Sequence, residues 1–318
     1  MFRIAFVALA ALALAAVSAS AQVVAIGTNP PGTIAYPTAA AIAKVATNDN
    51  FQVRVQPNGG PNVGVPQVAA GELDFQIINM IVAVFAYTGT GDFAGKAYPD
   101  VRLAAVLFPL RLGMFVKKDA PIQTIKDLRG KRVSTEYRSQ INSALMVEGI
   151  LASAGLTLAD IVSVPAPHVA RGADDFAAGR VDATFFSLGA GKVQEVSALV
   201  GGVRFLSLDD TPAARAAITR FAPGTYITGV QPSAANVGVI GPTNVLATDL
   251  VVLAGEKTPE ETVYRIVKAI HDHMPELGAT LASFREADAN QLAKKSTVPF
   301  HPGAMRYYRE VGQWPPKN

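Results

Sequence analysis

Apolar segments with the period of a β-strand alternate with amphipathic helical segments along most of the chain. Phe51–Val55 alternates apolar and polar residues, as a half-buried strand does. Pro259–Met274 carries its apolar residues on one helical face. Strands that alternate with helices favour parallel sheets whose faces are covered by helices. The pattern therefore predicts an α/β protein.

Clusters of Gly, Pro and Asn set the boundaries of these segments. The predicted strands are Val23–Ile26, Phe51–Val55, Asp74–Ile78, Val101–Phe108, Leu112–Val116, Lys131–Thr135, Ile161–Val164, Val181–Phe186, Val203–Leu206, Thr225–Gln231, Val237–Ile240 and Val245–Leu253. The predicted helices are Ala35–Val45, Val63–Ala70, a segment through Ala83 and Tyr87, Ser139–Ala154, Val169–Ala178, Gly189–Val200, Pro259–Met274 and Leu281–Leu292.

So many strands exceed one small sheet, and we expect them to divide into two α/β lobes. Pro109 and Arg111 interrupt an apolar stretch and are expected to break it into two strands. The chain is expected to cross between the lobes near Pro109 and near Ile240. Lobe 1 then comprises residues 22–110 and 241–318, and lobe 2 comprises residues 111–240.

The first 21 residues have the three parts of a secretory signal peptide. Arg3 supplies the positive charge, Ile4–Val17 the apolar stretch, and Ala19 and Ala21 the small residues of the cleavage site. The apolar stretch is too short for a membrane anchor, and no Cys is present for lipidation. We expect a soluble periplasmic protein that is not lipid-anchored.

Composition excludes several function classes. The 318 residues include 28 Lys and Arg against 25 Asp and Glu, a formal net charge of +3, without the basic blocks of a nucleic-acid-binding protein. The absence of Cys excludes Cys nucleophiles and Cys-bound metals. The four His lack metal-ligand spacing, and no Gly-x-Ser-x-Gly motif is present. We therefore expect no catalytic set, no metal and no cofactor.

The candidate binding site lies in loops that lead from a predicted strand into a predicted helix: residues 27–36, 56–62, 79–82 and 135–142. Ligands of open α/β sheets bind beyond the carboxyl ends of the strands. Helix N-termini there present free N–H groups and a partial positive charge, which suit a carboxylate. The candidate ligand-binding residues are Thr28, Asn29, Thr33, Tyr36, Asn58, Gly59, Asn79, Tyr137, Arg138, Ser139 and Phe186.

Arg138 is the sharpest candidate, because a guanidinium can grip a carboxylate with two parallel hydrogen bonds. The alternatives are a local pair with Glu136 or a solvated loop charge. Tyr137 and Tyr36 either contact the ligand or pack in the core. Phe185 and Phe186 face opposite sides of a strand, so that one is core and the other is free to form an apolar wall of the cleft.

Several segments resemble the TAXI family of solute-binding proteins, the periplasmic receptors of one type of TRAP transporter. The resemblance rests on Gly27–Pro37, Gln56–Gly60, Gly71–Phe75, Leu128–Ser134, Ala178–Phe186 and the C-terminal His301–Gly312. It implies a type II-like periplasmic-binding fold, with two hinge crossings and the ligand held between the lobes. It also implies a small organic anion, carboxylate or amino acid as ligand and TRAP permease subunits as partners. We expect a monomer.

Two loops differ from that family, which places Gly- and Ser-rich or small residues where this chain has Asn29-Pro30-Pro31 and Thr135–Ile141. Each Pro also removes a backbone donor from the first loop. The ligand therefore cannot be transferred from relatives. The alternatives to a TRAP receptor are a binding protein of an ABC or tricarboxylate-type importer and, less favoured, a periplasmic enzyme on the same fold.

Overall fold

A computed structural model describes residues 22–316; the predicted signal peptide, residues 1–21, lies outside them. The strands are β1 (Gln22–Thr28), β2 (Phe51–Pro57), β3 (Phe75–Asn79), β4 (Val101–Lys117), β5 (Arg132–Thr135), β6 (Val162–Pro165), β7 (Ala183–Ser187), β8 (Val203–Phe205), β9 (Tyr226–Val230) and β10 (Thr243–Gly255). The α-helices are α2 (Ala35–Ala46), α3 (Pro61–Ala70), α4 (Met80–Thr88), α5 (Ile141–Ser153), α6 (Val169–Ala177), α7 (Gly191–Leu199), α8 (Pro212–Phe221), α9 (Glu260–Asp272), α10 (Met274–Thr280) and α11 (Pro302–Glu310).

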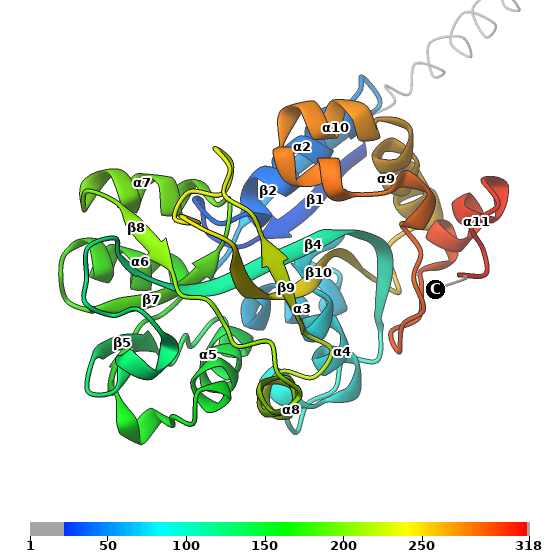
Figure 1. The fold of residues 1–318 in the computed structure, drawn as a ribbon. Helices are drawn as coiled ribbons and strands as arrows, with labels where there is room; N and C mark the ends of the chain where they lie inside the picture. Colours follow the sequence, from blue (N-terminus) through cyan, green and yellow to red (C-terminus); the bar gives the residue numbers. More distant parts are fainter. Residues whose placement is uncertain (1–21, 317–318) are drawn as a thin grey trace, which may run out of the picture.

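The strands form one mixed sheet in the order β2-β1-β3-β10-β4-β7-β5-β6, with β8 paired to β4 and β9 to β10. At one end β1 runs parallel to β2 and β3, and at the other end β5 runs parallel to β6 and β7. Helices flank both halves, which are joined by β4 across the middle of the molecule (Figure 1). The predicted α/β fold with two lobes is confirmed.

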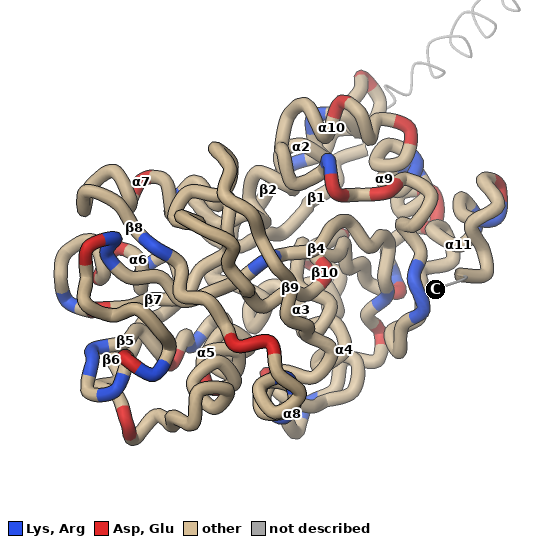
Figure 2. Tube along the Cα trace, viewed as in Figure 1, with Lys and Arg blue, Asp and Glu red and all other residues tan. Residues whose placement is uncertain are grey.

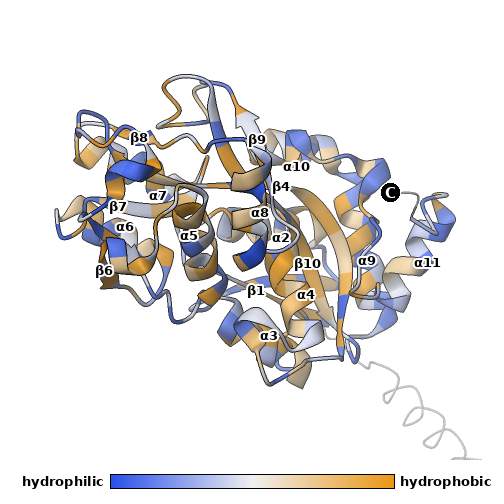
Figure 3. Cartoon of the chain, turned by 60° about the horizontal axis from the view of Figure 1, so that its bottom comes forward, coloured by the Kyte–Doolittle hydropathy of each residue, from blue (hydrophilic) through white to orange (hydrophobic). Residues whose placement is uncertain are grey.

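Strand β4 is continuous, so the predicted break at Pro109 into two strands is wrong. Pro109 lies opposite Asp249 of β10, where the pairing of the two strands shifts register before Val251. A residue without an N–H is tolerated at such an irregularity, because the ladder loses no regular hydrogen bond there. The apolar residues of β4 and β10 (Figure 3) therefore form one uninterrupted pair through the core.

The two long strands change partners between the lobes. Residues 112–117 of β4 pair with β7 and β8, whereas residues 101–112 pair with β10. In β10, Thr243–Ala247 pairs with β9 and Leu250–Ala254 with β3. The partners of β4 thus change near the crossing expected at Pro109. Those of β10 change later in the chain than Ile240, which lies before the strand.

Three further expectations differ from the structure. Val237–Ile240 is not a strand but a turn, and Leu281–Leu292 contains only short 3-10 turns, Ala282–Glu286 and Ala289–Gln291. The helix α8 was not predicted. Its start is nevertheless encoded, since the Thr211 hydroxyl accepts a hydrogen bond from the Ala214 N–H and Pro212 occupies the first turn.

The C-terminal segment packs on the half of the sheet that contains β1. Tyr308 of α11 is fully buried and its hydroxyl donates to the carbonyl oxygen of Ala104 in β4. The His301 imidazole caps α11 by accepting from the Gly303 N–H, and its burial lowers its pKa. This segment therefore closes the core of lobe 1.

Charged residues are dispersed over both lobes (Figure 2). Most of those near the ends of helices are engaged in ion pairs, such as Arg132 with Asp182 and Arg306 with Glu261. Among residues 22–316, no helix has the length and apolar character needed to cross a membrane.

Candidate functional site

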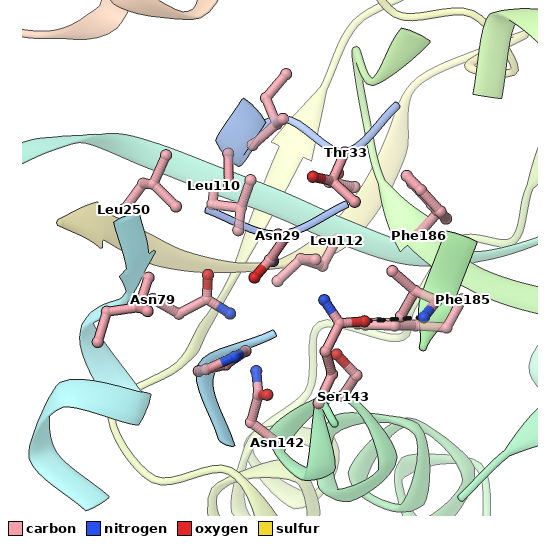
Figure 4. Close-up of a pocket in the computed structure, with 17 residues that line it drawn as sticks. Asn29, Thr33, Asn79, Leu110, Leu112, Asn142, Ser143, Phe185, Phe186 and Leu250 are labelled. Atoms are coloured by element: carbon pink, nitrogen blue, oxygen red, sulfur yellow. Dashed lines mark hydrogen bonds between the residues drawn. The ribbon is translucent and has the colours of Figure 1, made fainter. Parts of the chain in front are cut away.

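A cavity lies between the two lobes, against the strands that join them (Figure 4). It encloses about 490 Å³ of empty space, its solvent mouth included. That is near the lower end of the range for small-molecule pockets, roughly 300–1,000 Å³. The lining residues are Asn29, Thr33, Ile34, Ala35, Pro61, Ile78, Asn79 and Leu250 of lobe 1, Leu110 and Leu112 of β4, and Gln140, Asn142, Ser143, Val169, Phe185, Phe186 and Ser187 of lobe 2.

The topology places these residues together. In lobe 1, β1, β2 and β3 each lead into a helix, α2, α3 and α4, and the first turns of those helices or the loops before them line the cavity. In lobe 2, β5 and β6 lead into α5 and α6 in the same way. The cavity is therefore at the carboxyl ends of the strands of both halves, the place where open α/β sheets bind ligands.

The joining strand β4 contributes an apolar floor. Leu110 and Leu112 line the cavity, while Arg111 between them lies on the other face of the strand, as alternation requires. The Arg111 guanidinium is held there by two hydrogen bonds to the carboxylate of Glu286, at 2.6 and 2.5 Å. Its charge is therefore directed away from the cavity.

The polar lining consists of amides and hydroxyls. Among the described residues that line the cavity, none is Asp, Glu, Lys, Arg or His. The Oδ1 atoms of Asn29 and Asn142 are buried and accept no hydrogen bond from residues 22–316. Figure 4 shows the Asn142 side chain extending from its helix toward the side of the cavity where Asn29 and Asn79 lie. These two oxygens are open for donors of a ligand.

The helix N-termini of lobe 1 are available as donors. No side chain of the described residues caps α2, α3 or α4. The residues that precede or begin them, Ile34 and Ala35, Pro61, and Asn79, line the cavity. Uncapped N–H groups and the partial positive charge of the helix end favour an anion at this place.

The helix N-termini of lobe 2 are already occupied. The Ile141 N–H of α5 donates to Asn62 Oδ1 at 3.2 Å, and the Asn142 N–H donates to Asp92 Oδ2 at 2.7 Å. In α6, the Val169 N–H donates to Gln140 Oε1 at 2.8 Å, and the Arg171 N–H donates to the His168 Nδ1. Lobe 2 thus contributes side chains rather than free backbone donors.

The lobes are in contact across the cleft. Besides the Asn62 and Asp92 bonds, the Ser139 hydroxyl donates to the carbonyl oxygen of Gly59 at 2.5 Å, and the Lys192 N–H donates to that of Gly32 at 3.1 Å. Gly60 permits this approach, because a Cβ there would lie 2.3 Å from the carbonyl oxygen of Ser139. The structure is therefore that of the closed form.

Asp92, on the 3-10 turn Gly91–Phe93 (η1), is the one charged group of these contacts. Burial raises the pKa of its carboxyl to about 7, against the lowering effect of the hydrogen bond from Asn142. Its Oδ1 atom accepts no hydrogen bond from the described residues. The contact between the lobes therefore contains a group that titrates near neutral pH.

Four of the residues proposed from the sequence line the cavity: Asn29, Thr33, Asn79 and Phe186. Phe185 lines it as well, although the alternation of the strand predicts only one of the two rings at the cleft, and both rings are fully buried.

Four others lie beside it with structural partners. Thr28 is fully buried, and Tyr36 is partly buried on α2. The amide of Asn58 donates to Gln76 Oε1 and accepts from the Gly60 N–H, which fixes the second loop. Gly59 contributes its carbonyl oxygen to the contact with Ser139 rather than an N–H to the cavity.

The loop that leads into α5 places its residues differently from the expectation. Glu136 adopts a left-handed conformation, with φ 53°, which turns the chain at that point. Tyr137 is fully buried and its hydroxyl donates to the carbonyl oxygen of Ser134, whereas Arg138 is exposed and outside the cavity lining. Ser139 bonds across the cleft to Gly59.

Sequence reasoning missed the polar residues of the first turn of α5. The helix begins at Ile141 rather than at the expected Ser139, so that Gln140, Asn142 and Ser143 line the cavity. The signal present in the sequence is this run of amide and hydroxyl side chains directly before an apolar helix. The apolar lining residues carry no such signal, because they are indistinguishable from core.

The fold and the interlobe site define a two-lobe periplasmic binding protein fold. The chain belongs to the NMT1-like family, whose model matches residues 26–312. A solved structure described as that of a periplasmic transporter is similar with a TM-score of 0.59 and 15% identity, over 92% of this chain and 93% of that chain.

Two other solved structures are similar at lower scores. The alkanesulfonate-binding protein SsuA from Xanthomonas axonopodis pv. citri bound to MOPS has a TM-score of 0.47 and 16% identity, covering 84% of this chain and 80% of that one. The amino acid ABC transporter substrate-binding protein AbpA from Streptococcus pneumoniae bound to L-arginine has a TM-score of 0.48 and 14% identity, covering 83% and 95%.

Proposed function

We propose that the protein is an extracytoplasmic solute-binding protein that captures a small organic anion between its lobes and delivers it to a TRAP-type permease. The observation that carries the proposal is the closed cavity at the N-termini of α2 and α4, which no described side chain caps. Bound between the lobes, a ligand would contact both halves at once and favour their closure.

The lining favours binding over turnover. General acid–base catalysis requires a titratable group within hydrogen-bond reach of the substrate. The described lining residues are amides, hydroxyls and apolar side chains. Such a lining can orient a ligand but has no side chain that exchanges protons near neutral pH.

A thermal-shift screen of the purified, exported protein tests the binding function. A ligand that binds only the folded state raises the melting temperature by mass action, with about 2.7 kcal/mol of stabilisation at a concentration one hundred times Kd. We expect at least one small organic acid to give this shift. A flat response to monocarboxylates, dicarboxylates, oxo acids, hydroxy acids and amino acids would contradict the proposal.

The type of permease is tested separately by the neighbouring genes. A gene for a large fused membrane permease beside this one supports the TRAP proposal, which also rests on the resemblance of His301–Gly312 to the TAXI signature. A neighbouring ATPase gene together with a membrane permease would favour the ABC alternative.

A further inference from the structure

We infer that the ligand is a small monocarboxylate with a hydroxyl group and an apolar tail, rather than a dicarboxylate or a zwitterionic amino acid. The inference rests on the proposed function and specifies the ligand class of that site. It depends on three properties of the cavity: its charge balance, its unpartnered acceptors and its apolar wall.

The charge balance fits one negative charge. The N-termini of α2 and α4 reach the cavity without a capping side chain, and each helix end carries roughly half a positive charge. Together they offset about one carboxylate. A second carboxylate would enter a site whose described lining contains no cation, and an unpaired buried charge is strongly unfavourable.

The nearby charged residues are engaged elsewhere. Lys192 of α7, beside Gly32, has its ammonium paired with Asp174 and Glu195. On the acidic side, Asp92 is bonded to the Asn142 N–H and is not part of the lining. The ammonium of an amino acid would therefore meet only neutral oxygens.

The unpartnered acceptors call for a donor on the ligand. Asn142 is 3% exposed, lines the cavity, and its buried Oδ1 accepts no hydrogen bond from the described residues. The same holds for the Oδ1 of Asn29 on the opposite lobe. A buried acceptor left unpaired is costly. A hydroxyl next to the carboxylate would satisfy one of them without adding a charge.

The apolar wall determines the rest of the ligand. Leu110, Leu112, Phe185, Phe186 and Leu250 line the cavity from the joining strands and from lobe 2. Contact with this surface stabilises an alkyl tail and offers nothing to a second polar end. The modest volume suits a chain of a few carbons.

Four acids with six carbons separate these requirements in a calorimetric titration of the full exported protein. They are 2-hydroxy-4-methylpentanoate, 4-methylpentanoate, leucine and 2-hydroxyadipate. We expect 2-hydroxy-4-methylpentanoate to bind at least roughly tenfold tighter than leucine and 2-hydroxyadipate, whose extra charge is unpaired. It should bind about fivefold tighter than 4-methylpentanoate, which lacks the hydroxyl.

A variant tests the position of the carboxylate. Asn79→Asp puts a negative charge at the N-cap of α4, where Asp is a favourable capping residue, so that the melting temperature should not fall. Affinity for 2-hydroxy-4-methylpentanoate should fall at least roughly tenfold. The control Asn50→Asp makes the same change of charge at an exposed turn before β2 and should leave affinity unchanged.

Tighter binding of leucine or 2-hydroxyadipate, or full affinity of Asn79→Asp, would overturn this inference and leave the proposed function intact. The inference is also overturned if none of the four acids binds while another acid does. Failure of every organic acid to bind contradicts the proposed function itself.

Discussion

The two sides of the cavity are built from the same strand-to-helix unit but use it differently. In lobe 1 the first turns of α2 and α4 face the cavity without a capping side chain. In lobe 2 the first turn of α5 is capped by Asn62 and Asp92, which belong to lobe 1. The same backbone feature thus binds the ligand on one side and the opposite lobe on the other.

This difference suggests a division of labour. Lobe 1 supplies the anion site whether or not the lobes are closed, because its donors lie within one lobe. Lobe 2 supplies the apolar wall and the amide of Asn142, and the N–H groups of α5 find their partners only upon closure. Closure therefore satisfies helix α5 and completes the pocket in one step.

The largest expected effect is on stability, at the wall of lobe 2. Phe186 is 1% exposed and belongs to the core as well as to the cavity. Phe186→Ala should lower the free energy of unfolding by about 3–5 kcal/mol. Asn79→Ala, on lobe 1, removes a side chain that makes no capping bond and should cost less than about 0.5 kcal/mol. Equal losses in chemical denaturation would remove the distinction between wall and anion site.

The next effect concerns closure. Gly60→Ala should weaken ligand binding at least roughly tenfold, because its Cβ would lie 2.3 Å from the Ser139 carbonyl oxygen of the other lobe. Gly71→Ala is the matched control, since Gly71 also has a positive φ, 82°, but a Cβ there meets no atom within 4 Å. Both variants carry backbone strain, and only the first should lose affinity in a calorimetric titration. A similar loss in both would mean that strain rather than closure is responsible.

The contact at Asp92 should depend on pH. The folded protein holds the proton up to a pKa of about 7, against 3.8 for an ordinary Asp, so this group's contribution to stability is complete below about pH 4 and is lost as pH rises to 7. Asp92→Asn keeps an acceptor for the Asn142 N–H and cannot ionise.

The stability of Asp92→Asn relative to the natural protein should therefore rise between pH 5 and pH 8, by about 1–3 kcal/mol. Denaturation curves at several pH values measure this difference directly. Parallel pH profiles of the two proteins would show that Asp92 does not titrate in this range.

The smallest effect is expected at Arg138, which is exposed and outside the lining. Arg138→Ala should change ligand affinity by less than about 0.5 kcal/mol. A direct charged hydrogen bond would instead be worth about 1.5–3 kcal/mol. A loss of that size in the titration would move the anion site to lobe 2 and reverse the comparison.

The sequence predicts most of the fold, because its periodicity is strong. It does not predict the continuity of β4, since the tolerance of Pro109 depends on a register shift against β10 that involves a distant segment. The strand-to-helix loops lead to Asn29, Thr33 and Asn79, because position in an α/β unit follows from local order. The direction of Arg138 does not, since it depends on the left-handed turn at Glu136 and the burial of Tyr137.

The contacts between the lobes are likewise beyond local reasoning. Asn62 and Ile141 are 79 residues apart, and Asp92 and Asn142 are 50 apart. Only the tertiary arrangement reveals that the first turn of α5 is capped by the opposite lobe. A sequence can identify a helix start, but it cannot show which helix starts remain free for a ligand.

The most direct test is a crystal structure of the protein with its tightest-binding organic acid. The account predicts the carboxylate within hydrogen-bond distance of the first N–H groups of α2 or α4, with the apolar part against Phe185 and Phe186 and the contacts of α5 to Asn62 and Asp92 preserved. A carboxylate bound by Arg138, or by lobe 2 alone, would contradict it.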